Sequence, residues 1–253
     1  MNAPLVSVVI PVYNEEQTLV ANVRKVLGYL AANCRHPFEL TIAENGSNDR
    51  TGSIALKLQK EYEAVNVLSL PQKGRGRAVK EAWLRTEAEF LVYMDVDLST
   101  DLSSFPALIQ AMRDGGHDLA IGNRFAPTSS RKRSLKREIL SGGYNLLVKS
   151  ILKAHFSDAQ CGFKGITRRA ARELLPLVRD DYWFMDTELL ILAEHFGYSI
   201  AEIPVYWVDD PDSRVEIWST VWQDIKGLLR LRREIRQMTP PTRRSPGCTA
   251  DPN

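Results

Sequence analysis

Short apolar runs alternate with amphipathic segments over the first hundred residues of the chain. The runs, each of strand length, are Val6–Ile10, Phe38–Ala43, Val65–Leu70 and Phe90–Met94. Between them, apolar residues recur at helical spacing, as they do from Leu19 to Leu30. This alternation of strand and helix predicts an α/β fold with a mainly parallel central sheet flanked by helices.

The later part of the chain continues the pattern and then changes in composition. We expect helices at 102–112, 141–153, 168–178 and 215–238, and strands at 119–125 and 200–207. The last residues are rich in proline, threonine, arginine and serine, which is typical of a disordered tail. The predicted organisation is therefore an α/β domain over 1–212, an amphipathic helix over 213–238 and a tail over 239–253.

The fourth apolar run ends in two carboxylates, Asp95 and Asp97, on either side of Val96. A run this apolar suits a strand buried on both faces, and ligands bind at the carboxyl ends of strands in open α/β sheets. Two carboxylates suit Mg²⁺ or Mn²⁺, because substrate phosphates complete the coordination of these ions. Asp is also common in turns, so this motif alone leaves a metal site and a simple turn both open.

Two earlier turns, Pro11–Glu16 and Glu44–Asp49, follow the first and second predicted strands. Because strand ends in this fold class meet in one crevice, Pro11, Glu44 and Asp97 are expected to line one nucleotide site.

The third turn, Lys73–Ala78, is basic and rich in glycine. Its backbone amides, with Arg75 and Arg77, could bind phosphate, or the turn could simply be solvated. Its spacing does not match a dinucleotide-binding fingerprint.

Composition excludes several classes of function. The formal net charge of +2 predicts no general affinity for nucleic acid. Cys34, Cys161 and Cys248 lie far apart, which argues against zinc and disulfides and fits a reducing compartment. No apolar stretch is long enough to span a bilayer, and the N-terminus lacks the pattern of a signal peptide. We therefore expect a cytoplasmic protein, with any membrane contact peripheral and at the inner face.

Four motifs occur in the order seen in family 2 glycosyltransferases. They are Ile10–Glu15, Gly46-Ser47-x-Asp49-x-Thr51, Lys73-Gly74-x-Gly76 and Asp95-Val96-Asp97. Further on, Asp158–Lys164 resembles the polyprenyl-phosphate sugar transferases, especially the dolichyl-phosphate glucosyl- and mannosyltransferases. The resemblance covers about Val6 to Val208. It departs at Glu44-Asn45, where the family usually carries Asp-Asp, and this leaves the base preference open.

The resemblance implies a Rossmann-like glycosyltransferase A-type fold and a defined reaction. That reaction is the inverting, metal-dependent transfer of a hexose from a nucleotide-diphosphate sugar, UDP-glucose or GDP-mannose, to a polyprenyl or dolichyl phosphate. Two alternatives stay open: a glycosyltransferase with a soluble phosphorylated or glycan acceptor, and a nucleotide-sugar-binding scaffold without turnover. Retained Asp95 and Asp97 argue against the scaffold, because a scaffold needs no metal site.

The resemblance also implies roles for individual residues. The nucleotide-sugar site would include Pro11, Tyr13, Glu15, Glu44, Gly46, Lys73, Gly74, Asp95, Val96 and Asp97, with the metal on Asp95 and Asp97. The acceptor phosphate would meet Arg124, Arg137 and Ser141. Asp158 is the candidate for an assisting carboxylate, so the candidate catalytic residues are Asp97, Asp158, Arg124 and Arg137. Asp186 and Glu188 would orient a sugar hydroxyl or cap a helix.

Two basic regions could meet a membrane. The run 131–137 would be a solvated loop or a contact with lipid headgroups. The last predicted helix places tryptophan and aliphatic residues on one face and cations on another. The apolar face comprises Trp218, Val221, Trp222, Ile225, Leu228 and Leu229; the cations are Lys226, Arg230 and Arg233. The helix either packs on the domain or lies at a membrane interface.

Overall fold

The computed structural model describes residues 4–132, 135–208 and 217–240, with the backbone alone at 130–132, 135–141 and 217–221. The strands are β1 (Val6–Val12), β2 (Phe38–Asn45), β3 (Val65–Leu70), β4 (Phe90–Met94), β5 (Leu119–Asn123), β6 (Ser130–Lys132), β7 (Phe163–Thr167), β8 (Ile200–Pro204) and β9 (Tyr206–Val208). The α-helices are α1 (Leu19–Asn33), α2 (Thr51–Glu61), α3 (Arg75–Arg85), α4 (Phe105–Arg113), α5 (Leu135–Leu152), α6 (Arg168–Leu174), α7 (Met185–His195) and α8 (Ile217–Glu234). Single 3₁₀ turns at Leu102–Ser104, Leu175–Leu177 and Ile235–Gln237 precede α4 and follow α6 and α8.

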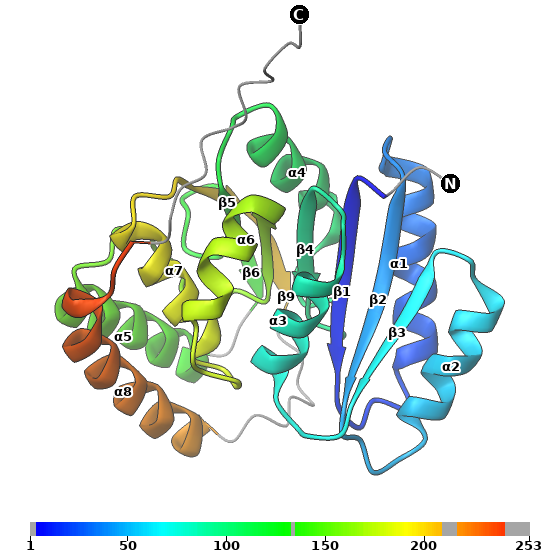
Figure 1. Cartoon of the computed structure of the whole chain (residues 1–253), viewed down its shortest axis with the longest axis horizontal. Helices are drawn as coiled ribbons and strands as arrows, with labels where there is room; N and C mark the ends of the chain where they lie inside the picture. Colours follow the sequence, from blue (N-terminus) through cyan, green and yellow to red (C-terminus); the bar gives the residue numbers. More distant parts are fainter. Residues whose placement is uncertain (1–3, 133–134, 209–216, 241–253) are drawn as a thin grey trace, which may run out of the picture.

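Seven strands form one sheet in the order β3-β2-β1-β4-β7-β5-β8 (Figure 1). β1 pairs in parallel with β2 and β4, β2 with β3, and β5 with β8. The predicted mainly parallel sheet is therefore confirmed. β7 is the exception, because it runs antiparallel to both of its neighbours.

Helices cover both faces of the sheet, and the core has two parts. Buried side chains of α1, α2 and α4 pack on one face, and those of α3, α6 and α7 pack on the other. The central strands β1 and β4 are fully buried, which explains their nearly continuous apolar runs. The carboxyl ends of the parallel strands lie together at the lower edge in Figure 1, where the candidate site is found.

The predicted edge strand at 200–207 is divided in the structure. It breaks after Pro204, which has no N–H to continue the ladder, and its last residues form β9, paired with β6 in a separate two-stranded sheet. β9 reaches the candidate site, because Trp207 bridges to Thr100 in the loop that follows β4.

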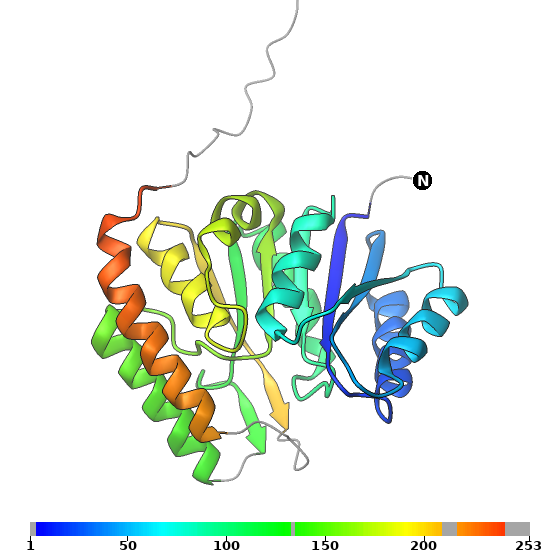
Figure 2. The ribbon, with the colours of Figure 1, turned by 60° about the horizontal axis from the view of Figure 1, so that its bottom comes forward.

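α8 lies beside α5 at the end of the molecule farthest from α2 (Figures 1 and 2). It packs through Gly227 and Leu228, and a Cβ on Gly227 would lie 2.5 Å from the ring of Phe184. The predicted apolar face is therefore divided: Leu228 is buried, whereas Trp222 is 60% exposed and Leu229 is 45% exposed. Within the described residues, none of the helices has the length and apolar character needed to cross a bilayer.

Candidate functional site

The turns after β1 and β2 interlock through hydrogen bonds between their backbones and side chains. The Asn14 backbone N–H donates to Ser47 Oγ at 3.0 Å, and Asn14 Oδ1 accepts from the Asn48 N–H at 2.8 Å. The Glu15 N–H donates to Thr51 Oγ1 at 2.7 Å. The motif residues of both turns thus hold each other in place and form one rigid wall at the edge of the sheet.

Asn45 joins this wall to the glycine-rich turn that opens α3. Its buried side chain donates to the Val12 carbonyl at 2.7 Å and accepts from the Gly74 N–H at 3.0 Å. Gly46 has φ +77°, and a Cβ there would lie 3.1 Å from the backbone N of Lys73. A glycine is therefore required where these two turns meet.

Glu44 lies inside this assembly, and its carboxylate is already engaged. It accepts from the Ser47 N–H at 2.5 Å and from Ser69 Oγ at 2.9 Å, and the residue is only 6% exposed. The expected place of Glu44 in the nucleotide-sugar site stays a prediction. At the outer edge of the wall, the Lys73 ammonium lies 4.0 Å from the centre of the Tyr13 ring, while Pro11 is buried within β1.

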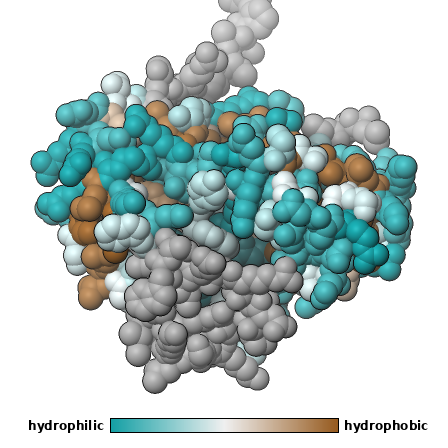
Figure 3. Space-filling model, turned by 90° about the horizontal axis from the view of Figure 1, so that it is seen from below, coloured by the Kyte–Doolittle hydropathy of each residue, from teal (hydrophilic) through white to brown (hydrophobic). Residues whose placement is uncertain are grey.

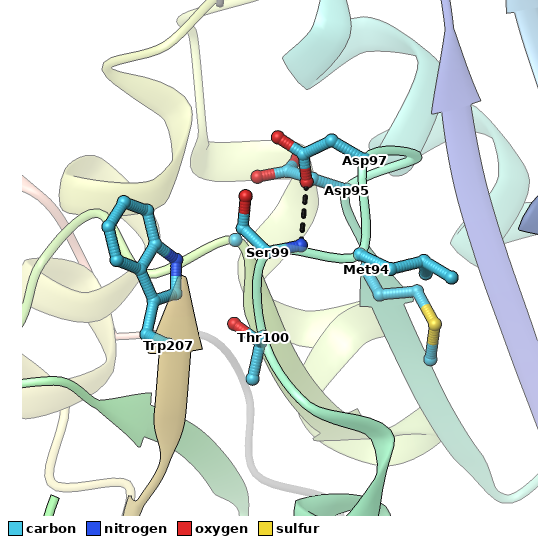
Figure 4. A pocket seen from close by; sticks show the side chains of 8 residues that line it. Met94, Asp95, Asp97, Ser99, Thr100 and Trp207 are labelled. Carbon is cyan, nitrogen blue, oxygen red and sulfur yellow. Dashed lines mark hydrogen bonds between the residues drawn. The ribbon is translucent and has the colours of Figure 1, made fainter. Parts of the chain in front are cut away.

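Asp95 and Asp97 project from the loop after β4 into one small pocket (Figure 4). Asp97 is exposed, and its Oδ1 accepts from the Ser99 N–H at 2.9 Å. Leu98, which lies between Asp97 and Ser99, has φ 52°, so the chain turns sharply here. The other lining residues are Met94, Leu98, Ser99, Thr100, Gly162 and Trp207.

Arg75 from the glycine-rich turn is paired with two carboxylates. Its Nη2 lies 2.8 Å from Asp95 Oδ1, and its Nη1 lies 2.8 Å from Asp186 Oδ2. Arg77 pairs instead with Asp181 at 2.7 Å. Both arginines are held in ion pairs, so neither is a simple solvated turn residue. The pairing of Arg75 with Asp95 was not predicted from the sequence.

Asp186 is the centre of a buried charge cluster behind Asp95. Its Oδ1 accepts from the Tyr93 hydroxyl at 2.5 Å and lies 3.2 Å from Lys164 Nζ. Burial opposes its charge, but Lys164 and Arg75 outweigh burial and hold its pKa below the usual value. Asp186 makes no capping hydrogen bond and is 2% exposed, so the expected capping role is wrong for this residue. Its expected contact with a sugar hydroxyl stays a prediction.

Glu188 is also a structural residue. It is fully buried and accepts from the N–H groups of Arg179 and Asp180, at 3.1 and 2.8 Å. Its Oε1 lies 2.9 Å from Arg230 on α8. Glu188 thus holds the loop before α7 and links it to α8.

The structure brings Arg124 and Asp158 together as a bidentate pair. Arg124 Nε donates to Asp158 Oδ2 and Arg124 Nη2 donates to Asp158 Oδ1, each at 2.7 Å. Asp158 Oδ2 also accepts from the Arg124 backbone N–H at 3.0 Å. Burial of Asp158 is complete and opposes its charge, yet Arg124 holds its pKa below the usual value. Asp158 therefore stays ionised and has no exposed surface. Arg137 and Ser141 belong to α5, but their side chains lie outside the described residues.

A comparison with known protein families identifies the family of this chain. The model of "Glycosyl transferase family 2" matches residues 7–175, which include all three strand-end turns, Asp95, Asp97 and Asp158. The chain belongs to glycosyl transferase family 2. It is a glycosyltransferase, and the predicted family and enzyme class are confirmed.

Curated relatives of this family 2 transferase extend the match. Glycosyltransferase AglD of Haloferax volcanii is 37% identical over 217 residues, covering 84% of this chain but 34% of AglD, so the chain spans about a third of that relative. Proteins named dolichyl-phosphate beta-glucosyltransferase are 34% identical in Drosophila melanogaster, over 84% of this chain and 70% of that protein, and 30% identical in Dictyostelium discoideum, over 89% and 73%.

Solved structures show the same fold. Glucosyl-3-phosphoglycerate synthase of Mycobacterium tuberculosis, in complex with UDP, has a TM-score of 0.68 and 21% sequence identity, over 91% of this chain and 80% of that one. This likeness confirms the glycosyltransferase A-type fold predicted for the chain.

The carboxylates of this pocket fit a divalent ion whose coordination would be completed by a substrate. Among the described residues, His, Cys, Asp and Glu form no group of three or more that could hold a metal ion. Asp95 and Asp97 instead offer two carboxylates in one pocket, which matches Mg²⁺ or Mn²⁺ bound by few protein ligands and by phosphate oxygens. The residues present therefore fit the implied ion.

Proposed function

We propose that this glycosyltransferase transfers a hexose, with inversion, from a nucleotide-diphosphate sugar to a polyprenyl phosphate. The observation that carries the proposal is the pocket at the end of β4, where Asp95 and Asp97 meet Gly162 of the Asp158–Lys164 motif. The names of the curated relatives support a dolichyl-phosphate acceptor and a glucosyl donor.

The donor would lie along the wall formed by the turns after β1, β2 and β3. Tyr13 and Lys73 stand at its outer edge, where an aromatic ring and an ammonium suit a base and a phosphate. Glu15, Gly46 and Gly74 fix the turns through backbone contacts. UDP-glucose is the first donor to test, and GDP-mannose is the second.

Asp97 and Asp95 would hold Mg²⁺ or Mn²⁺ on the donor diphosphate. When bound, the ion would stabilise the charge that grows on the leaving diphosphate. Asp97 is exposed at the pocket, while Asp95 is 33% exposed and is held on one side by Arg75. Asp97 is therefore the ligand that is easier to reach.

The acceptor phosphate would be positioned by Arg124, with Arg137 and Ser141 of α5. A phosphate monoester is largely ionised near neutral pH, since its second pKa is about 6, so it needs orientation more than a strong base. Asp158 would act by fixing the Arg124 guanidinium through its two hydrogen bonds, and this bidentate pair supports such a role. We therefore propose Asp158 as a positioning residue for Arg124.

The exposed side of α5 and α8 would contact the membrane that carries the acceptor, at its cytoplasmic face. Trp222, Leu229 and Leu146 of this side are 60%, 45% and 66% exposed, and hydrophobic side chains gather at this end of the molecule (Figure 3). Lys226 lies beside Trp222, 5.3 Å from its ring, and Arg233 is exposed on the same helix. Apolar and cationic side chains together suit an anionic lipid surface.

A two-phase transfer assay tests the reaction. Purified protein receives radiolabelled UDP-glucose or GDP-mannose with Mg²⁺ or Mn²⁺ and a polyprenyl phosphate in detergent. We expect label to enter the organic phase and to be lost when a chelator is added. Label that enters only water-soluble products from phosphorylated acceptors would show the soluble-acceptor alternative, and donor binding without turnover would show the scaffold.

A further inference from the structure

Arg75 pairs with the Asp95 carboxylate, which is one of the two proposed ligands of the divalent ion. Its Nε and Nη2 both donate to Asp95 Oδ1, at 3.0 and 2.8 Å. Its guanidinium also lies between two aromatic rings, 4.8 Å from the centre of Tyr93 and 4.7 Å from that of Trp183. The side chain is only 11% exposed, so this is a built position and not a loose surface contact.

The position of Arg75 is also fixed by a second ion pair of its guanidinium and by close packing of the backbone next to it. Nη1 pairs with the buried Asp186, which Lys164 and Tyr93 hold in turn. The next residue, Gly76, is packed so closely that a Cβ there would lie 2.7 Å from both Met185 Cβ and the Tyr182 carbonyl oxygen. The start of α3 is thus locked against the segment that carries Asp186.

The charges of this cluster cancel. Arg75 and Lys164 supply two cations, and Asp95 and Asp186 supply two carboxylates. A divalent ion that approaches Asp95 without a nucleotide therefore meets a carboxylate whose charge is already balanced, with a guanidinium on its Oδ1. A nucleotide diphosphate brings its own negative charges and would offset that repulsion.

We infer that Arg75 is a positioning residue that holds the Asp95 carboxylate in its orientation and makes binding of the divalent ion depend on the donor diphosphate. This inference rests on the metal site of the proposed function. Arg75 acts through Asp95, since its contacts in the cluster are with carboxylates and aromatic rings and its role needs no contact with the sugar.

Titration of Mn²⁺, followed by the loss of its free electron-paramagnetic-resonance signal, tests this role without measuring transfer. Wild type, Arg75→Met and Arg75→Lys are titrated alone and with UDP, and with GDP in a parallel series. We expect wild type to bind Mn²⁺ at least tenfold more tightly with the nucleotide. Arg75→Met should bind Mn²⁺ alone at least tenfold more tightly than wild type, and Arg75→Lys, which keeps the charge, should remain close to wild type.

Arg77→Met is the matched control, because it removes a cation of the same turn that pairs with Asp181 and not with Asp95. It should leave the affinity for Mn²⁺ alone unchanged. If Arg75→Met does not fold, Arg75→Met/Asp186→Asn removes the buried acid as well and allows the same comparison.

Two outcomes would overturn the inference, and they are distinguishable. Equal Mn²⁺ affinity of wild type and Arg75→Met, each without nucleotide, would remove the role of Arg75 and leave the metal site standing. Failure of wild type to bind Mn²⁺ even with a nucleotide would overturn the proposed metal site itself.

Discussion

Asp95 directly follows β4 and Gly162 directly precedes β7, and the antiparallel pairing of Met94 with Phe163 places the two opposite each other. The Asp95 N–H donates to the Gly162 carbonyl at 3.1 Å. The sequence predicted Asp95 at a strand end because an apolar run stops there, but it could not predict Arg75 as its partner. Nor could it predict Asp186, which is 111 residues from Arg75, since such pairs depend on how the strands are ordered.

The first prediction concerns Gly162, where a Cβ would lie 1.6 Å from Asp95 Oδ2. Gly162→Ala must displace the Asp95 carboxylate, and a misplacement of this kind costs about 100-fold in rate. We expect transfer activity to fall by at least tenfold in the two-phase assay. Gly28→Ala is the control: it lies in α1 with no atom within 4 Å, and should keep activity and gain roughly 0.5–1 kcal/mol of stability. Full activity of Gly162→Ala would contradict the close contact.

The second prediction concerns Asp224 on α8. Burial raises its pKa from 3.8 to about 7, with Asp180 and Asp186 adding to the rise, although Gln160 donates to it at 2.9 Å. The folded protein therefore keeps the Asp224 proton up to about pH 7, whereas the unfolded chain loses it near pH 4. This group lowers stability as pH rises between these values, by up to about 4 kcal/mol.

Urea unfolding of wild type and Asp224→Asn between pH 4.5 and 7.5 measures this effect. The variant cannot lose a proton, so its stability should improve relative to wild type as pH rises. Two curves that stay parallel across the range would show that Asp224 titrates normally in the folded protein.

At the scale of elements, the strongly periodic segments were predicted well and β7 was not. β3 begins and ends where its apolar run does, and the helical spacing expected from Leu19 to Leu30 corresponds to α1, Leu19–Asn33. β7 contains Lys164 and Gly165, which interrupt the apolar pattern by which a buried strand is predicted. Lys164 is nevertheless buried, because it pairs with Asp186. The side chains of α4 pack closely over Gly165, since a Cβ there would lie 2.6 Å from Met112 Cε. Tertiary contacts, not local preference, make this segment a strand.

The third prediction tests how α8 is held. Gly227→Ala would place a Cβ 2.5 Å from the buried ring of Phe184 and should push α8 outward, at a cost of about 1–3 kcal/mol. Urea midpoints measure the loss. Gly143→Ala in α5 meets no atom within 4 Å and should be neutral or stabilising. Unchanged stability of Gly227→Ala would mean that α8 does not pack through this residue.

At the scale of the whole molecule, the wall formed by the turns after β1 and β2 and the α5–α8 side lie in different parts of the fold (Figures 1 and 2). The sequence predicted an amphipathic last helix but assigned Leu228 and Trp222 to one face. In the structure the inward side instead includes the polar Asp224 beside Leu228. Periodicity identifies an amphipathic helix, but it does not show which side a neighbouring helix covers.

The fourth prediction tests membrane contact by cosedimentation with anionic phospholipid vesicles. Trp222→Gln/Leu229→Gln removes two exposed apolar groups of α8, and we expect the bound fraction to fall several-fold. Leu56→Gln on α2 is the matched control, because Leu56 is 53% exposed at the opposite end of the molecule. Equal loss in both variants, or none in either, would contradict a membrane contact through α8.

The most direct test of the central claim is transfer of labelled hexose to polyprenyl phosphate by Asp97→Asn. This variant keeps the shape of the side chain at the end of β4 and removes its charge, so the account predicts a loss of at least 100-fold in label entering the organic phase. Asp101→Asn alters a nearby carboxylate that accepts from the Ser103 N–H, and it should retain activity. Wild-type transfer by Asp97→Asn would contradict the assignment of this pocket as the catalytic centre.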